Sequence, residues 1–380
     1  MIRWFYKYGF LLMLFNTILY SINQTKDTVA PFLFYLIMGL GLLFVLVNPS
    51  QIRGVLFHKS FSFLMALNFI NLVYYLFFDS ISNFQSLEYL MARFMSFALI
   101  SLSIYHNFQY YKNNFFPLLI KIIFIVVIVG LFIDPFILSA RYYGIIWNPN
   151  MLASLTILAF SFLFLKNEKK SNFEIFMMLL LIIVTLSTGS RSVLIAVVLS
   201  FVMKYGFTIR NILYSIMLII SIILISNTNL DTSFNRISSQ GIFNDRTEQF
   251  YFAVDNLKQK LFVGYGLDEY SGLPKDIEIP EELENLIVGA HNGYLSILIQ
   301  YGILFGGLVV LIMFRKSLQI IQFFKNISGI YNIYLFVIIY TLIVANFESL
   351  FTGINEFHTL LFWLSLSFLS HAKFLSNHEI

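Results

Sequence analysis

The chain has 380 residues, of which 58% are hydrophobic and only 12% charged, with a formal net charge of +4. Soluble domains are about 45–50% apolar and about 25% charged, so this composition excludes an ordinary soluble protein, and its hydrophobicity excludes a disordered chain. The absence of cysteine excludes a disulfide framework, a thiolate nucleophile and a cysteine-based metal site.

Apolar stretches recur along the whole chain, and a membrane helix needs about 20 apolar residues. The pattern predicts an all-α polytopic membrane protein with about 12 transmembrane helices. Their expected ranges are 9–22, 30–47, 61–78, 89–106, 115–133, 149–165, 174–188, 191–206, 212–226, 293–314, 332–347 and 357–372. The first span resembles a signal peptide, but no small-residue cleavage site follows it, so we expect it to remain in the protein.

Lys and Arg are distributed unevenly between the two sides that these spans define. With the N-terminus in the cytoplasm, most of them fall on the cytoplasmic side, as the positive-inside rule requires. The short outer loops then hold only Lys26, Arg141 and Arg191. Both termini are therefore predicted to be cytoplasmic.

A long, acidic outer loop at 227–290 separates predicted transmembrane helices 1–9 (residues 1–226) from helices 10–12 (residues 291–380). Within it, Asp245 and Glu248 have the spacing of a helix-capping box. Apolar residues follow at helical spacing and predict the buried face of a short helix: Phe250, Val254, Leu257 and Leu261. A second short helix is expected to begin at Pro280.

Three polar motifs each precede a span that runs from outside to inside. They are GIIWNPNMLA (144–153), GSRS (189–192) and AHNGYL (290–295). Each motif should therefore lie at a helix N-terminus on the outer face. Free N–H groups and the positive end of the helix dipole favour anions there, phosphate above all. The sequence thus predicts an outward-facing anion site.

Within these motifs, Arg191 and His291 are the strongest candidates for catalytic or substrate-binding residues. Arg191 could be an interfacial anchor that reaches the headgroups, but an arginine outside opposes the positive-inside bias, which favours a functional role. His291 could be a capping or core residue. A helix N-terminus and nearby arginines should keep its imidazole neutral, however, and able to accept a proton.

Other polar residues leave alternatives open. Arg246 could bind an anion or form a salt bridge with Asp245 or Glu248, and Arg141 could anchor the membrane interface. Glu348, at the outer end of the span 332–347, could pair with one of these arginines. We expect His358 to be structural, whereas Arg93 and Lys121, inside spans, fit either snorkelling residues or buried partners.

The order of these motifs resembles the O-antigen ligase and O-antigen polymerase superfamily. The matching pattern is GxxxNPNxLA, then GSRS before a span, then a long outer loop with NDRTEQFYFAVDNLKQKLFVGYGLDEY and AHNGYL. The resemblance covers roughly residues 140–310 and the layout of spans, and Gly264 and Gly266 occupy its G-x-G position. Phe250 departs from the pattern, because a tryptophan is common there.

The resemblance implies a metal-independent, inverting glycosyltransferase, without cofactors, that acts outside the bacterial cytoplasmic (inner) membrane. Its donor would be a glycan on polyprenyl diphosphate. Arg191 and Arg246 would bind the diphosphate, and His291 would be the general base. To substrate binding we assign further polar residues of the motifs and their surroundings: Arg141, Asn150, Ser190, Ser192, Asn292, Tyr294 and Glu348.

The acceptor separates two activities within that superfamily. A polymerase extends another lipid-linked repeat unit of O-antigen, capsule or exopolysaccharide, whereas a ligase transfers the chain to lipid A core. We favour the polymerase, because the short outer loops carry no extra basic cluster for a phosphorylated core. A transporter or flippase is a more distant alternative, since only Arg93 and Lys121 mark a path through the bilayer. Expected partners are the lipid-linked donor and acceptor and membrane lipids, with a chain-length regulator and a repeat-unit flippase as candidates, and no nucleic acid.

Overall fold

The computed structural model describes residues 2–79, 83–137, 141–206, 208–211, 213–214, 217, 246–268, 290–327 and 329–377. In this part of the chain every named element is an α-helix. The helices of the N-terminal half are α1 (Ile2–Tyr20), α2 (Val29–Val47), α3 (Pro49–Leu56), α4 (Ser62–Phe78), α5 (Phe84–His106), α6 (Phe108–Asn113) and α7 (Phe115–Ile133). The remaining helices are α8 (Pro149–Leu165), α9 (Asn172–Ser187), α10 (Ser192–Tyr205), α13 (Arg246–Gln259), α14 (Gly293–Phe324), α15 (Tyr331–Val344) and α16 (Phe357–Ser376).

Every predicted span except one coincides with a helix; the exception, 212–226, lies outside the continuously described residues. Among the described helices, α2, α5, α7 and α14 are long and apolar enough to cross a membrane, and α4, α8, α9, α10 and α15 are apolar but shorter. The structure is thus that of an all-helical, multi-pass membrane protein. The total of about 12 crossings stays a prediction.

Short polar sequences fix where several of these helices begin. The Asn148 side chain accepts a hydrogen bond from the N–H of Asn150 and caps α8 ahead of Pro149. Ser171 and Glu174 form a reciprocal capping box at the start of α9. Such caps satisfy N–H groups that the first helical turn leaves without partners. They define the turn between α8 and α9 and the start of α8.

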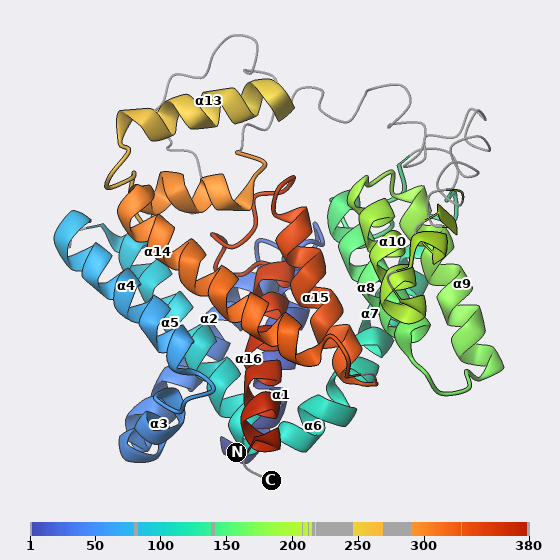
Figure 1. Ribbon diagram of the computed structural model, residues 1–380, viewed down its shortest axis with the longest axis horizontal. Helices are drawn as coiled ribbons and strands as arrows, with labels where there is room; N and C mark the ends of the chain where they lie inside the picture. Colours follow the sequence, from blue (N-terminus) through green and yellow to red (C-terminus); the bar gives the residue numbers. More distant parts are fainter. Residues whose placement is uncertain are drawn as a thin grey trace.

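The helices form a bundle in which α16 is the most enclosed element. Side chains from Phe357 to Ala372 are all buried, and α16 packs against α1, α5, α14 and α15. On one side of the bundle, α8 lies between α7, α9 and α10 (Figure 1). Helix α13 lies across the start of α14, and the two chain ends lie together at the opposite end of the bundle (Figure 1).

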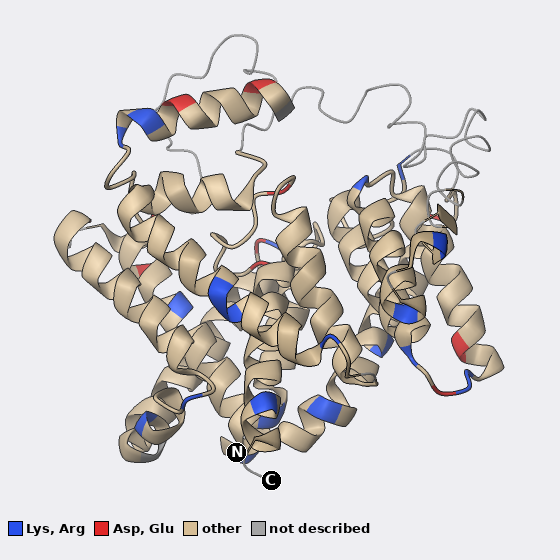
Figure 2. Ribbon diagram, in the orientation of Figure 1, with Lys and Arg blue, Asp and Glu red and all other residues tan. Residues whose placement is uncertain are grey.

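Basic residues lie at both ends of the bundle, on α13 as well as near the termini (Figure 2). Figure 2 shows Lys and Arg on α3, on α6 and in the turn between α8 and α9, all of them away from α13. The predicted orientation, with both termini in the cytoplasm, stays a prediction.

The G-x-G sequence has a structural explanation in a break of α14. Gly302 has a φ of 69° inside that helix, and Gly264 has a φ of 69° where it packs against the backbone of Gln300 and Gly302. Tyr265 N–H donates to the Ile299 carbonyl at 2.9 Å, so the loop hydrogen-bonds to the helix at the break. A Cβ at either glycine would collide with backbone atoms. Gly264 and Gly302 therefore permit the close contact that joins the loop after α13 to α14.

The buried face of α13 differs from the predicted one. Phe250 is 41% exposed, whereas Gln249, Ala253 and Asn256 are buried. Ala253 packs with Ala290, Leu295 and Ile299 at the start of α14, with Val254 and Leu257 at the edge. Because the small Ala253 brings α13 close to α14, the bulky Phe250 lies on the exposed side. The predicted cap at Asp245 and the helix start at Pro280 lie outside the described residues.

Candidate functional site

Arg141 joins the start of α8 to the turn that contains the GSRS motif. Its Nε donates to the Thr188 carbonyl at 3.0 Å, and its Nη2 donates to Asn150 Oδ1 at 3.0 Å. Tyr142 N–H also donates to the Ser187 carbonyl at 2.9 Å. The guanidinium group thus holds two of the three predicted motifs together. Asn150, assigned to substrate binding, contributes its side-chain oxygen to this contact.

The GSRS motif forms a tight turn into α10. Gly189 has a φ of 67°, a conformation that favours glycine. The hydroxyl groups of Ser190 and Ser192 lie 3.0 Å apart, and Ser192 also hydrogen-bonds the phenol of Tyr340 in α15. Arg191 is the N-cap residue of α10 and is partly buried. The turn therefore presents Arg191 at a helix N-terminus, where the dipole favours an anion.

The AHNG motif holds His291 in an unusual backbone conformation. His291 has a φ of 43°, which few non-glycine residues adopt. The following residue, Asn292, caps α14: its Oδ1 accepts from the N–H groups of Tyr294 and Leu295, both at 3.0 Å. Asn292 therefore has a structural role as a cap. It fixes His291 at the start of α14.

The loop between α15 and α16 supports the AHNG motif. Gly293 N–H donates to the Ala345 carbonyl at 2.7 Å, and a Cβ at Gly293 would lie 2.6 Å from the Leu350 carbonyl oxygen. The Tyr294 hydroxyl donates to the Leu342 carbonyl at 2.5 Å. Tyr294 is therefore bound to α15, and the glycine permits the close approach of the loop.

Glu348 lies in the same loop and connects the two halves of the site. It is partly buried, and its charge acts on both Tyr340 and Glu356. Since Tyr340 contacts Ser192, residues from the GSRS turn and from the loop beside AHNG converge on one phenol. The sequence analysis did not select Tyr340, because a tyrosine inside an apolar span has no distinguishing pattern.

Arg93 is a buried partner of this loop. It is 3% exposed, and its Nη2 donates to the carbonyl oxygens of Phe351, Thr352 and Gly353 at 2.9, 3.1 and 3.1 Å, and to the Tyr89 hydroxyl at 3.2 Å. The sequence analysis left its role undecided between snorkelling and burial. The contacts identify Arg93 as the cation that holds the loop before α16 in place.

Glu356, also absent from the predicted site, lies at the end of this loop and beside Thr359. The Thr359 hydroxyl donates to its Oε2 at 2.5 Å. Burial raises the pKa of the Glu356 carboxyl to about 7, although the Thr359 hydrogen bond and the charge of Arg93 oppose the shift. The nearby Glu348 raises that pKa further. The loop therefore contains a carboxyl group that titrates near neutral pH.

This titration predicts that stability depends on pH. The pKa of Glu356 is higher in the folded protein, so its stabilising contribution is complete below about pH 4.5 and is lost as the pH rises through about 7. Thermal unfolding in detergent should therefore show a Tm that falls between about pH 5 and about pH 8. Glu356→Gln should flatten this decline, while Glu248→Gln on exposed α13 should leave it unchanged. If the Tm of Glu356→Gln declined as much as that of the wild type, groups other than Glu356 would be responsible for the pH dependence.

His358, predicted to be structural, lies near the same tyrosine. It is 8% exposed, and its ring lies 5.5 Å from the Tyr340 ring in an edge-to-face arrangement. Among the described residues, its Nε2 has no hydrogen-bond partner. His358 thus packs in the core below the site.

The three motifs come together at the α13 end of the bundle, but not every predicted residue can be placed there. Arg246 begins α13, and its side chain lies outside the description. Lys121 is exposed on α7 and lines a groove bordered by the turn between α8 and α9. In the described part of the chain, no group of three or more His, Asp and Glu side chains could hold a metal ion.

The comparisons with known proteins bear on this region. No curated protein matches the sequence at a significant level. Residues 176–312, which include the GSRS turn, α13 and the AHNG motif, match a protein-family model described as O-antigen ligase. Together with the all-helical membrane fold, this match supports the assignment of the chain to the O-antigen ligase and polymerase-like superfamily.

Proposed function

We propose that this protein is a membrane glycosyltransferase that polymerises lipid-linked oligosaccharide repeat units on the outer face of the cytoplasmic membrane. The observation that carries the proposal is the convergence of the GSRS turn and the AHNG motif, through Ser192, Tyr340 and the loop that bears Glu348. Two helix N-termini thereby present an arginine and a histidine at one end of the bundle. Such an arrangement suits a substrate that carries both a diphosphate and a reacting hydroxyl.

His291 acts as the general base in this proposal. Its imidazole takes the proton of the acceptor sugar hydroxyl while the oxygen forms a bond to the anomeric carbon of the donor. The bond from that carbon to the diphosphate oxygen breaks, and its electron pair leaves with the polyprenyl diphosphate. A direct displacement of this kind inverts the anomeric centre.

Arg191 and Arg246 stabilise the departing diphosphate. Guanidinium groups match phosphate oxygens with paired donors, and they act most strongly where negative charge develops in the transition state. Arg141 already donates to Thr188 and Asn150. We therefore propose that Arg141 positions the turn that carries Arg191. Ser190 and Ser192 complete that turn, and Asn292 and Tyr294 fix His291 from the other side.

A ligase activity is the second candidate, favoured by the description of the matching family model as O-antigen ligase. Polymerase and ligase share the donor chemistry and differ in the acceptor. An assay of the purified protein can distinguish the two activities. It offers the same donor with either a second lipid-linked repeat unit or a lipid A core oligosaccharide as acceptor. Extension of the repeat unit alone supports the polymerase, and transfer to the core alone supports the ligase.

The proposed chemistry needs no divalent cation, because the diphosphate already activates the donor and arginines neutralise its charge. We expect the purified protein to extend a lipid-diphosphate-linked oligosaccharide at the same rate with and without EDTA. Product length resolved by gel or mass spectrometry measures this. Loss of extension in EDTA, with recovery on addition of Mg²⁺ or Mn²⁺, would exclude the metal-free mechanism.

A further inference from the structure

An open groove with a volume of about 620 Å³ lies at the end of the bundle away from α13, between α7, α8, α9 and the start of α15. Its walls are mainly apolar and include Phe124, Phe162, Phe173, Met177 and Ile333. We call it the α7–α9 groove. Its volume is within the range of about 300–1,000 Å³ that is typical of ligand sites.

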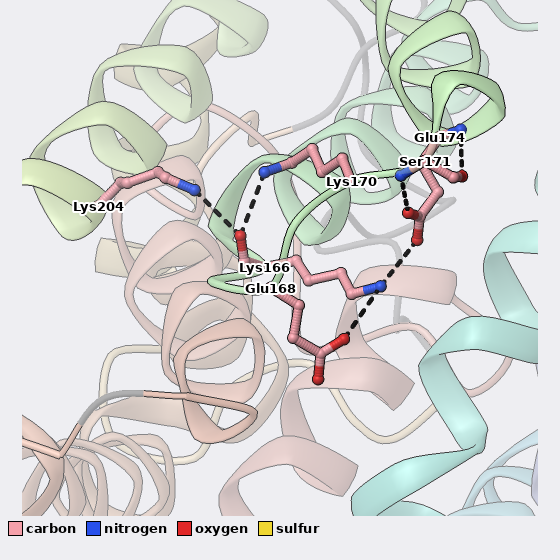
Figure 3. Close-up of polar contacts among 6 residues, drawn as sticks. All are labelled: Lys166, Glu168, Lys170, Ser171, Glu174 and Lys204. Atoms are coloured by element: carbon pink, nitrogen blue, oxygen red, sulfur yellow. Dashed lines mark hydrogen bonds and ion pairs between the residues drawn. The ribbon is translucent and has the colours of Figure 1, made fainter.

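A fixed set of charges forms one rim of this groove. The Lys166 ammonium group lies 3.2 Å from Glu168 Oε2 and 2.9 Å from Glu174 Oε1 (Figure 3). Glu174 is held further by the Ser171 N–H, which donates to its Oε2 at 2.8 Å. Both acidic groups of the rim are therefore engaged by Lys166.

Two more ammonium groups converge on the end of α8. Lys170 Nζ donates to the Lys166 carbonyl at 3.2 Å, and Lys204 Nζ donates to the same oxygen at 3.1 Å (Figure 3). Backbone carbonyls, not carboxylates, satisfy these cations. Lys170 and Lys204 lie beside the groove, whose own lining carries Lys121 and Lys166 against Glu168 and Glu174. Because Lys166 engages both of these glutamates, Lys121 is the lining cation that is left to meet a ligand.

Lys121 lies on the other wall of the groove. It is exposed, and within the described residues its ammonium group has no hydrogen bond, ion pair or cation–π contact. Helix α7 begins at Phe115, and Lys121 lies about 9 Å further along the helix axis. A lysine at that depth extends its stem along apolar surface and brings its charge to the headgroup level.

We propose that the α7–α9 groove binds an acyl chain of an anionic phospholipid, whose phosphate pairs with Lys121. Basic pockets between membrane helices on the cytoplasmic side recognise such lipids, and each basic side chain near the surface contributes a modest attraction. The apolar wall receives the chain, and Lys121 receives the phosphate of the headgroup. The inference does not depend on the proposed transferase activity, because the groove lies at the opposite end of the bundle.

Native mass spectrometry of the purified protein can test this with phosphatidylglycerol and phosphatidylcholine of equal chain length. We expect phosphatidylglycerol to bind about fivefold more tightly, and Lys121→Gln to remove that preference. Lys121→Arg should keep it, as should Lys59→Gln, which removes an exposed lysine outside the groove. Equal preference in Lys121→Gln and the wild type, or the same loss in Lys59→Gln, would overturn the proposal.

A second variant tests the apolar wall separately. Phe173 is 60% exposed and lines the groove, so its removal should not disturb the fold. Phe173→Ala should weaken the binding of both lipids alike, because it shortens the wall that contacts the chain. Glycerol phosphate, which has the headgroup phosphate without acyl chains, should not displace phosphatidylglycerol. Unchanged lipid binding in Phe173→Ala, or displacement by glycerol phosphate, would contradict a role for the acyl chain.

Discussion

Replacing His291 by asparagine is expected to lower the rate of glycan transfer by about 10²–10⁴-fold, the usual contribution of a general base. Asparagine tolerates the positive φ of this position, so the turn before α14 should survive while the proton acceptor is lost. Polymer length in a deletion strain and the initial rate of the purified protein measure the effect. The variant should insert into the membrane normally but make no long chains.

The matched control for this variant is His106→Asn. His106 is exposed at the end of α5, where it stacks on Tyr6 at 5.4 Å, far along the chain from the predicted site. It should retain activity. If the His291→Asn strain made long chains, His291 would not be the general base.

Replacing Arg93 by alanine is expected to destabilise the fold by about 3–5 kcal/mol. The change removes one buried cation from three backbone carbonyls and a tyrosine hydroxyl, and leaves them without their donor in the core. It also removes the positive charge that opposes the raised pKa of Glu356. Thermal unfolding in detergent should show a large drop in Tm for Arg93→Ala. The Tm of Arg93→Lys should lie between that of Arg93→Ala and that of the wild type.

The control for Arg93 is Arg53→Ala, since Arg53 is exposed on α3. A surface substitution of this kind usually changes stability by less than about 0.5 kcal/mol. If Arg93→Ala unfolds at the temperature of the wild type, the loop before α16 does not depend on this guanidinium group.

The membrane helices could be predicted from sequence because long apolar runs leave few alternatives. Predicted spans such as 115–133 and 149–165 have the bounds of α7 and α8. The start of α8 was readable for a similar reason, since Asn148 and Pro149 form a local cap. Local signals of this kind do not depend on the rest of the fold.

Residues whose partners are distant in the chain could not be interpreted in the same way. Arg93 bonds to carbonyls more than 250 residues later in the sequence, and backbone carbonyls carry no sequence signal. The buried face of α13 was mispredicted at Phe250 because hydrophobicity alone does not reveal that α14 is approached through Ala253. Tyr340 and Glu356 acquire their positions only when α15 and α16 come together with α10 and α5.

The most direct test of the account measures both products of the proposed reaction with purified protein and a defined lipid-diphosphate-linked oligosaccharide. Each new glycosidic bond should be accompanied by one released polyprenyl diphosphate, and His291→Asn should suppress both together. Chain growth without release of diphosphate, or release of diphosphate without new glycosidic bonds, would contradict transfer from a polyprenyl diphosphate donor.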